Sequence, residues 1–211
     1  MKIKEENKYK LLVEGNDDQH VVWALCNHYE ITQNFDVIDC ESIDNVFKQL
    51  ELRLKSSILN ERIGIVVDAD VNLQSRWNKV SSILLNNGGY TLPKTLPTDG
   101  LFITSTNNGT IIGVWIMPNN KLNGMLEDFL AFLATDGDLL MKEAEETLFG
   151  LETKKINRYK MIHRSKAKIH TYLAWQDEPG KPMGISITAK ILNADSPFAN
   201  NFITWLKKIY S

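Results

Sequence analysis

Between residues 9 and 85, short apolar segments alternate with segments in which apolar residues recur at helical spacing. The strand-like segments are residues 9–13, 35–40 and 62–67, and the helical ones are residues 17–29, 42–54 and 73–85. Ser42 is the expected cap of the second helix, and residues 86–89 (NNGG) end the third. Parallel strands need a long crossover between them, usually a helix. Three strand–helix units in succession therefore predict a parallel sheet covered by helices.

The pattern changes after residue 100. Residues 101–105 and 110–117 are two strand-like runs joined by TNNG, which predicts an antiparallel hairpin. Helices are expected at residues 124–134, 139–149, 166–175 and 197–210. We predict an α/β chain with about four or five mainly parallel strands. Residues 1–135 would form the core, and residues 136–211 a helical, basic extension packed on it.

Composition excludes several other classes of protein. The chain has 211 residues, of which 43% are hydrophobic and 24% charged, as in globular domains rather than disordered chains. Apolar runs such as residues 111–117 are far shorter than the roughly 18 residues of a membrane span. Residues 1–10 are charged and lack the apolar region of a secretion signal. A cytoplasmic protein is expected, with Cys26 and Cys40 as free, buried thiols.

Charge is distributed unevenly along the chain. Residues 151–211 hold 11 Lys and Arg against 4 Asp and Glu, a net charge of +7, which leaves 13 against 22, or −9, for residues 1–150. A chain that is acidic first and basic last suits a protein that binds cations at one place and phosphates at another.

Carboxylates follow two of the three predicted parallel strands. Glu14 ends the first strand and is followed by Gly15, which permits a sharp turn, and Asp68 and Asp70 follow the third. A spacing of two residues would place both aspartates on the same side of an extended chain. Because the carboxyl ends of parallel strands meet at one rim, these groups would repel one another unless a cation neutralised them. Oxygen ligands without cysteine point to Mg²⁺ or Mn²⁺.

These residues carry a resemblance to a known family. Residues 11–18 (LLVEGNDD) and 66–70 (VVDAD) resemble the motifs of the Toprim domain found in topoisomerases, bacterial primases and OLD-family nucleases. Residues 115–120 (WIMPNN) with 124–128 (GMLED) are similar to the extra acidic motif of OLD-like Toprim nucleases. Residues 170–180 (HTYLAWQDEPG) are similar to the tail of small stand-alone bacterial Toprim proteins of unassigned function.

The resemblance implies a Rossmann-like Toprim fold and Mg²⁺-dependent hydrolysis of nucleic acid, with DNA favoured over RNA. Glu14 would be a general acid/base or metal ligand, and Asp68 and Asp70 metal ligands. Further ligands of a second ion would be Asp18 with Glu127 or Asp128. The chain shows no glycine-rich phosphate loop, so any ATPase would be a separate polypeptide.

Basic residues in the last third of the chain are the expected contacts to phosphate. The proposed nucleic-acid-binding residues are Lys154, Lys155, Arg158, Lys160 and Arg164. OLD-like nucleases use a basic residue after the acidic motifs, and Lys166 or Lys168 would supply it here.

Other interpretations stay open at this stage. Asp18, Glu127 and Asp128 could simply complement helix N-termini, and the basic run could be a solvated helix face. The protein could be a latent or non-catalytic effector that partners a separate ATPase, for example in phage defence. It could also be an aspartate-based phosphatase that uses Asp68 and Asp70. A homodimer is compatible with the sequence.

Overall fold

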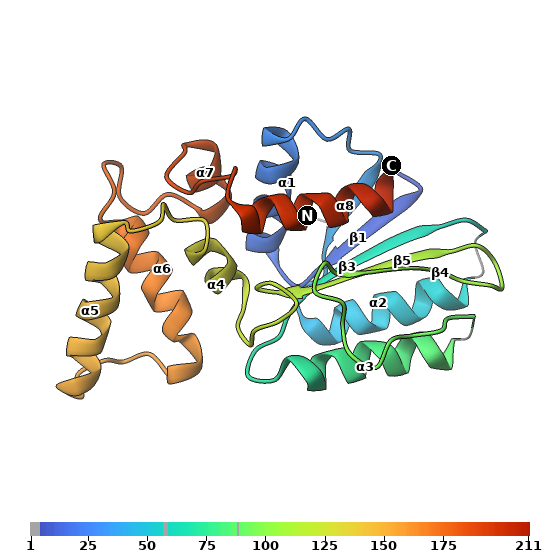
Figure 1. The fold of residues 1–211 in the computed structure, drawn as a ribbon, viewed down its shortest axis with the longest axis horizontal. Helices are drawn as coiled ribbons and strands as arrows, with labels where there is room; N and C mark the ends of the chain where they lie inside the picture. The colour runs from blue at the N-terminus through green and yellow to red at the C-terminus, as the bar shows by residue number, and fades with distance from the viewer. Residues whose placement is uncertain (1–4, 57–58, 88) are drawn as a thin grey trace.

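The structure, a computed structural model, describes residues 5–56, 59–87 and 89–211. Its centre is one five-stranded sheet in the order β2-β1-β3-β5-β4 (Figure 1). The strands are β1 (Tyr9–Val13), β2 (Phe35–Asp39), β3 (Arg62–Asp68), β4 (Leu101–Thr104) and β5 (Ile111–Met117). All neighbours pair in parallel except β4, which pairs antiparallel with β5 at the edge. The predicted α/β class, with a mainly parallel sheet and one hairpin, is confirmed.

Helices connect the strands and continue the chain after β5. They are α1 (Asn16–His28), α2 (Ile43–Lys55), α3 (Leu73–Asn86), α4 (Leu126–Ala131), α5 (Leu139–Thr153), α6 (Arg164–Ala174), α7 (Met183–Thr188) and α8 (Pro197–Tyr210), with a 3₁₀ turn, η1, at Met161–His163. Several begin at side-chain caps. The Ser42 side chain accepts a hydrogen bond from the Asn45 N–H, and the Asn72 side chain accepts one from the Ser75 N–H.

Both faces of the sheet are buried because side chains alternate along its strands. In β1, Leu11 and Val13 face the cluster that contains α1 and α8, whereas Leu12 faces the cluster that contains α2 and α3. Figure 1 shows these two helical layers on opposite sides of the sheet. The strands therefore read as nearly continuous apolar runs rather than as alternating ones.

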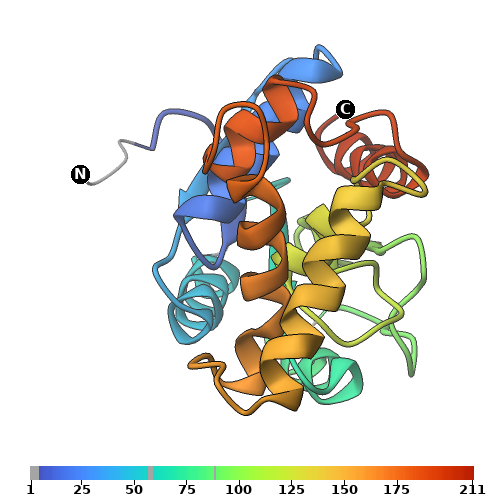
Figure 2. The ribbon, with the colours of Figure 1, turned by 90° about the vertical axis from the view of Figure 1, so that its left-hand side faces the viewer.

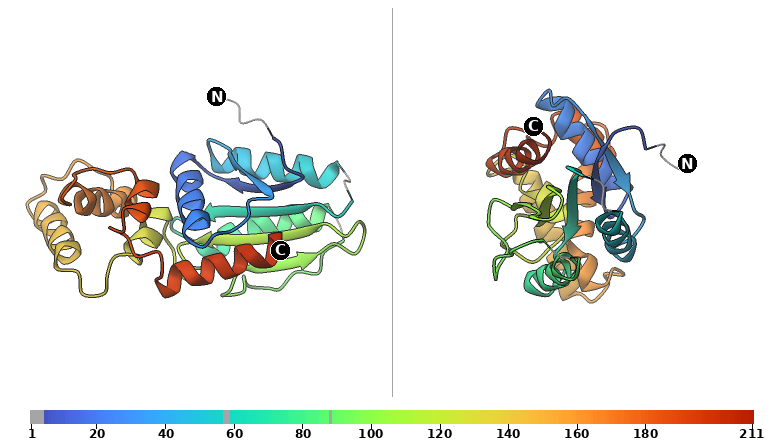
Figure 3. Two further views of the ribbon diagram at one scale, coloured as in Figure 1. Left: turned by 90° about the horizontal axis from the view of Figure 1, so that it is seen from above. Right: turned by 90° about the vertical axis from the view of Figure 1, so that its right-hand side faces the viewer.

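The C-terminal helix lies directly against the sheet, as the left view of Figure 3 shows. Two glycines make this close approach possible. A Cβ added at Gly64 would lie 2.5 Å from the Tyr210 hydroxyl, and one added at Gly113 would lie 2.0 Å from the Ile209 side chain. The last residues of the chain thus complete the core formed by the first strands.

Helices α5 and α6 form a helical arm (residues 139–174) beyond the carboxyl ends of the parallel strands. They pack side by side in Figure 2, and α6 also contacts α4. The Arg164 guanidinium ties them together, since it donates to Glu145 at 2.6 Å and to Glu152 at 2.8 Å. The arm stands beside the rim at which the carboxylates were expected.

Some predicted boundaries are wrong. The helix expected over residues 124–134 spans only Leu126–Ala131, because Gly124 has a φ of +139° and pairs its backbone with Asp70. Helix α5 continues to Thr153 instead of ending at Phe149. Helix α7 was not predicted, and its six residues, MGISIT, show no clear helical pattern. Gly88, and residues 1–4 of the charged N-terminal segment, lie outside the described residues.

Two expectations from composition have structural counterparts. Cys26 and Cys40 are buried and unpaired, as predicted. Within residues 5–56, 59–87 and 89–211, no helix combines the length and the apolarity that crossing a membrane requires.

Candidate active site

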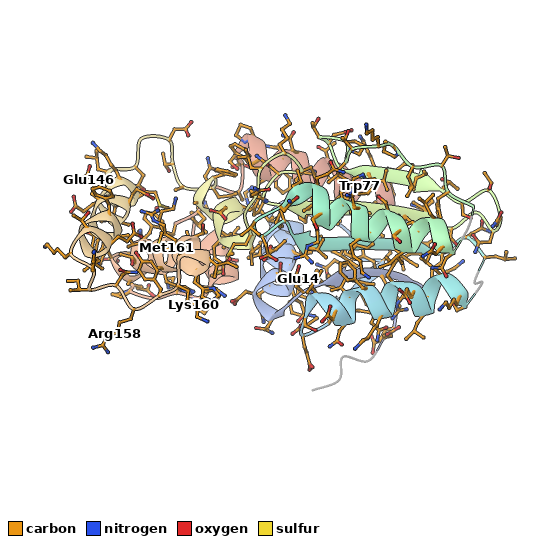
Figure 4. All side chains as sticks on the ribbon, turned by 90° about the horizontal axis from the view of Figure 1, so that it is seen from below. Glu14, Trp77, Glu146, Arg158, Lys160 and Met161 are labelled. Carbon is orange, nitrogen blue, oxygen red and sulfur yellow. The ribbon has the colours of Figure 1, made fainter. Side chains whose placement is uncertain are left out.

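Glu14 and Asp68 are brought together by the pairing of β1 with β3. Oε1 of Glu14 accepts a hydrogen bond from the Asp68 backbone N–H at 2.8 Å. Oδ1 of Asp68 in turn accepts one from the backbone N–H of Leu126, at 2.9 Å. The two carboxylates therefore lie at the carboxyl ends of adjacent parallel strands, against the start of α4, as the sequence predicted for these strand ends. Figure 4 labels Glu14 at the end of the sheet that faces the helical arm.

Asp18 from α1 and Glu127 from α4 add two more carboxylates at this place. Both residues are buried, at 9% and 5% exposure. Burial, together with the charges of Glu14 and Glu127, raises the pKa of Asp18 to about 8. Burial also raises the pKa of Asp68 well above its usual range, and the charges of Asp18, Glu14 and Glu127 contribute. Four acidic side chains from three segments of the chain thus lie near one another, and their negative charges disfavour ionisation of Asp18 and Asp68.

The pKa of Glu14 is raised by burial, although less strongly. The hydrogen bond from the Asp68 N–H and the nearby Arg76 guanidinium both oppose the shift, whereas Asp70 adds to it. An oxygen of Glu14 is already held in place by the backbone of the neighbouring strand. The carboxylate is therefore oriented before any ligand arrives.

The donor set fits a hard divalent cation by its chemistry, since it consists of partly desolvated carboxylate oxygens whose mutual repulsion a dication relieves. Within the described part of the chain, no three acidic, histidine or cysteine side chains converge closely enough to form a finished ion site. An ion would therefore have to draw free oxygens of Glu14, Asp18, Asp68 and Glu127 together.

Asp70 does not lie beside Asp68 on an extended chain, so that expectation is wrong. Strand β3 ends at Asp68, and Asp70 adopts a φ of +51° and pairs its backbone with Gly124. Its Oδ2 accepts a hydrogen bond from Arg76 at 2.5 Å, and the Arg76 Nε donates to the carbonyl oxygen of Asp68 at 2.7 Å. Arg76 is a site residue that the sequence reasoning missed, since an arginine on an amphipathic helix gives no distinctive signal.

Asp128 has both carboxylate oxygens engaged. Oδ2 accepts the backbone N–H of Met125 at 2.9 Å and thereby caps α4, and Oδ1 accepts the Ser165 hydroxyl at 2.6 Å. The geometry favours the helix-capping interpretation for this residue. Ser165, also missed from sequence, fixes α6 against α4 and so sets the position of the next residue, Lys166.

The two lysines proposed for catalysis have different surroundings. Lys166 Nζ lies 3.1 Å from Oε1 of Glu127, at the carboxylate cluster, whereas Lys168 Nζ lies 3.3 Å from Oε2 of Glu145 on the arm. Burial alone would lower the pKa of Lys166, but the charge and hydrogen bond of Glu127 outweigh it and raise the pKa. Lys166 is therefore a cation at the site, and Lys168 is part of the packing of α5 on α6.

The residues predicted to contact phosphate also have different surroundings: some are exposed in a loop, and one is held in ion pairs. Residues 154–163 connect α5 to α6, and we call them the basic loop. Its exposed cations are Lys154, Lys155, Arg158 and Lys160. Arg164 follows the loop but is committed to Glu145 and Glu152. The loop cations therefore remain the better candidates for binding phosphate.

Gly15 does not make the sharp turn expected of it. Its φ of −153° is ordinary extended backbone, and a Cβ added there would meet the nearest atom, Oδ2 of Asp18, at 3.6 Å. Any residue could adopt this conformation, so the glycine is not required by backbone geometry.

The fold and the position of the carboxylates show the class of protein: it is a Rossmann-like α/β protein with an acidic site at the carboxyl ends of its parallel strands. Residues 8–211 match a family model described as "Protein of unknown function (DUF3226)", and the chain belongs to that family. This is not the Toprim family model, so the resemblance to Toprim domains stays a prediction. A comparison with curated proteins finds no match.

Solved structures similar to this chain include the C-terminal region of the OLD protein of Xanthomonas campestris pv. campestris. The form phased with iodine is 17% identical, with a TM-score of 0.48 over 96% of this chain and 95% of that chain. The form phased with platinum is 16% identical, with a TM-score of 0.47 over 96% and 93%. A similarity of this size does not by itself support a function.

Proposed function

We propose that this protein is a metal-dependent phosphodiesterase that hydrolyses nucleic acid, with Mg²⁺ or Mn²⁺ as cofactor. The observation that carries the proposal is that Glu14, Asp18, Asp68 and Glu127 lie near enough for their charges to add to burial in raising the pKa of Asp18 and Asp68, beside the ammonium group of Lys166. Buried carboxylates that lie near one another destabilise the fold unless a cation or a proton neutralises them, and strongly shifted pKa values of this kind are typical of functional sites.

The residues that would hold the ion are Glu14 and Asp68, with Asp18 and Glu127 completing the set. When bound, such an ion lowers the pKa of a water molecule and stabilises charge on phosphate oxygens. Asp70 and Asp128 were also predicted as ligands, but the side chain of Asp70 is 39% exposed and turned to the Arg76 guanidinium, and both oxygens of Asp128 are hydrogen-bonded. In this proposal Asp70 and Asp128 are not ion ligands but hold neighbouring parts of the site in position.

The remaining chemistry belongs to the side chains around the set. Lys166 is half exposed, at 51%, so its ammonium group, which Glu127 holds at one side, can also contact a phosphate at the mouth of the site. A positive charge there stabilises the negative charge that develops on the phosphate in the transition state. We assign to Glu14, which the Asp68 N–H orients, the role of accepting a proton from an attacking water.

Incubation of the purified full chain with labelled DNA and RNA, with Mg²⁺ or Mn²⁺, tests the proposal. Glu14→Gln and Asp68→Asn are expected to abolish cleavage, and Glu143→Gln, an exposed carboxylate on α5, is the matched control. A second readout is thermal unfolding. An ion at about 100 times its Kd adds roughly 2.7 kcal/mol to the free energy of unfolding.

The wild type and Glu143→Gln should show this ion-dependent stabilisation, and Glu14→Gln and Asp68→Asn should not. Without ion, Glu14→Gln should melt close to the wild type, because the glutamine oxygen can still accept the Asp68 N–H. Cleavage that persists in both site variants, or turnover of small phosphorylated molecules in place of nucleic acid, contradicts the proposal.

A further inference from the structure

The basic loop presents large aliphatic side chains to solvent as well as cations. Ile156 is 59% exposed, Met161 61% and Ile162 47%. Met161 and Ile162 are adjacent on η1, immediately after Lys160. Three large aliphatic side chains within ten residues are therefore open to contact by a partner, and apolar groups exposed together on a surface mark interaction sites.

The loop is held in a defined shape by the residues beneath it. The Tyr159 hydroxyl donates to Oε1 of Glu152 at 2.6 Å, and the His163 N–H donates to the Lys160 carbonyl at 2.8 Å. Arg164 closes the base of the loop on α5. The backbone that carries the exposed aliphatic side chains is therefore held in place, and a partner that covers them need not order the loop first.

The charge of the basic loop favours a partner that carries negative charge. Lys154, Lys155, Arg158 and Lys160 lie in the loop, and the next acidic residue after Glu152 is Asp177. No ion pair within the described residues neutralises these four cations. Phosphates spaced along a backbone match cations spaced along a loop.

The type of apolar side chain separates duplex from single-stranded nucleic acid. Proteins that bind single strands stack bases on aromatic rings, but the tyrosine of the loop, Tyr159, is partly buried and tied to Glu152, and the other ring of the loop is the smaller imidazole of His163. Proteins that bend duplex DNA insert aliphatic wedges such as Ile, Leu or Met between base steps. Met161 and Ile162 are aliphatic side chains of the type that such wedges use.

We propose that the basic loop binds duplex DNA through its cations and inserts Met161 and Ile162 at a base step beside the carboxylate site. The inference rests on the proposed action on nucleic acid and names the substrate class. Ile162 is four residues from Lys166, so the wedge would act within about 14 Å of the site, or a few base steps. Figure 4 labels Arg158, Lys160 and Met161 on the arm that faces Glu14.

Binding of the full chain is measured in the Glu14→Gln background without divalent ion, so that no duplex is cut. The probes are a perfect 30-base-pair duplex, the same duplex with one central mismatch, and the corresponding single strand, each with 2-aminopurine near the centre. We expect the mismatched duplex to bind roughly tenfold more tightly than the perfect one, because unstacking a mismatch costs less. The 2-aminopurine fluorescence should rise on binding.

The wedge variant is Met161→Ser with Ile162→Ser, and the matched control is Ile185→Ser, which removes a 52% exposed isoleucine from α7. The wedge variant should lose both the mismatch preference and the fluorescence rise, and the control should keep them. Arg158→Ala with Lys160→Ala should weaken binding to every duplex alike and reduce the slope of log K against log salt by about 1.8, since each phosphate contact contributes about 0.9.

Four results overturn the inference. The single strand could bind more tightly than the duplex, or the wedge variant could behave like the wild type. The salt slope could stay unchanged in the cation variant, or the exposed aliphatic side chains could be needed only for binding a protein partner. A protein that shows the expected binding but does not cut DNA with Mn²⁺ contradicts the proposed nuclease activity and leaves this inference standing. A wedge variant that binds like the wild type and still cleaves DNA contradicts this inference and leaves the proposed nuclease activity standing.

Discussion

Lys166 Nζ lies 3.1 Å from Oε1 of Glu127, and this ion pair joins a half-exposed lysine to a nearly buried carboxylate. The glutamate comes from the first turn of α4 and the lysine from the first turn of α6. The Ser165 hydroxyl, one residue before Lys166, donates to Asp128, one residue after Glu127, and this hydrogen bond holds the two helices in register. The arm therefore delivers one cation to the acidic rim of the sheet.

Replacing Lys166 with Met is expected to reduce cleavage by at least about 100-fold, because a charge that faces the developing phosphate charge is lost. Affinity for Mn²⁺ should not fall, since a competing cation next to Glu127 has been removed. Single-turnover cleavage and Mn²⁺ titration measure the two effects separately. Lys168→Met is the control, because its partner is Glu145, and its cleavage rate should stay within about threefold of the wild type. Equal losses in both variants would contradict the assignment.

Replacing Arg76 with Met is expected to strengthen Mn²⁺ binding by about threefold or more, because the guanidinium is a fixed positive charge at the acidic rim. Methionine keeps an apolar stem for the Phe47 ring, whose centroid lies 5.9 Å from the guanidinium carbon. Isothermal titration with Mn²⁺ gives the affinity, and Arg76→Lys should resemble the wild type. Weaker binding in Arg76→Met would show instead that Arg76 orients Asp70 as a ligand.

The ion pair between Lys10 and Asp36, which is not part of the carboxylate site, should make the stability of the fold depend on pH. Lys10 Nζ lies 2.6 Å from Oδ2 of Asp36, and both side chains are largely buried. Burial alone would raise the pKa of Asp36, but the hydrogen bonds from Lys10 and Asn7 outweigh it and lower the pKa below its ordinary 3.8. The lowered pKa stabilises the folded state above pH 3.8, and this stabilisation is lost as the pH falls through the folded-state value.

Asp36→Asn should therefore lower the free energy of unfolding by about 3 kcal/mol at pH 7, as breaking a buried ion pair does. The difference from the wild type should shrink as the pH falls from 5 to below 3.8. Urea unfolding at a series of pH values measures it, with Asp44→Asn at the start of α2 as the control. A difference that stays constant over this range would rule out the pair as its source.

Removing the hydroxyl group of Tyr210, near the C-terminus, should lower the stability of the fold. Its buried hydroxyl donates to the Lys10 carbonyl at 2.7 Å and accepts from the Gly64 N–H at 3.1 Å, so it links α8 to two strands. Tyr210→Phe keeps the stacking on Phe35 but leaves two buried backbone groups unpaired. We expect a loss of about 1–3 kcal/mol in the free energy of unfolding, measured in urea. A change below about 0.5 kcal/mol would mean that water replaces the hydroxyl.

The fold was largely predictable because its signals are local. Apolar runs followed by helical spacing located β1 to β3 and α1 to α3 within a few residues. Helix α7 was missed because its backbone is stabilised by tertiary packing: a Cβ at Gly184 would lie 2.6 Å from the His20 carbonyl oxygen of α1. Such packing leaves no periodic pattern in six residues.

The sequence alone determined which carboxylates end the parallel strands, because strand direction and spacing are enough to place Glu14 and Asp68 at one rim. Only the tertiary structure decided which acidic residues keep free oxygens, since that depends on contacts between distant segments. Ser165 and Met125 engage both oxygens of Asp128, whereas Arg76 engages one oxygen of Asp70 and Lys166 one oxygen of Glu127. Local periodicity reports which face of an element is buried, but a hydrogen bond of about 3 Å is set by how helices and strands pack in three dimensions.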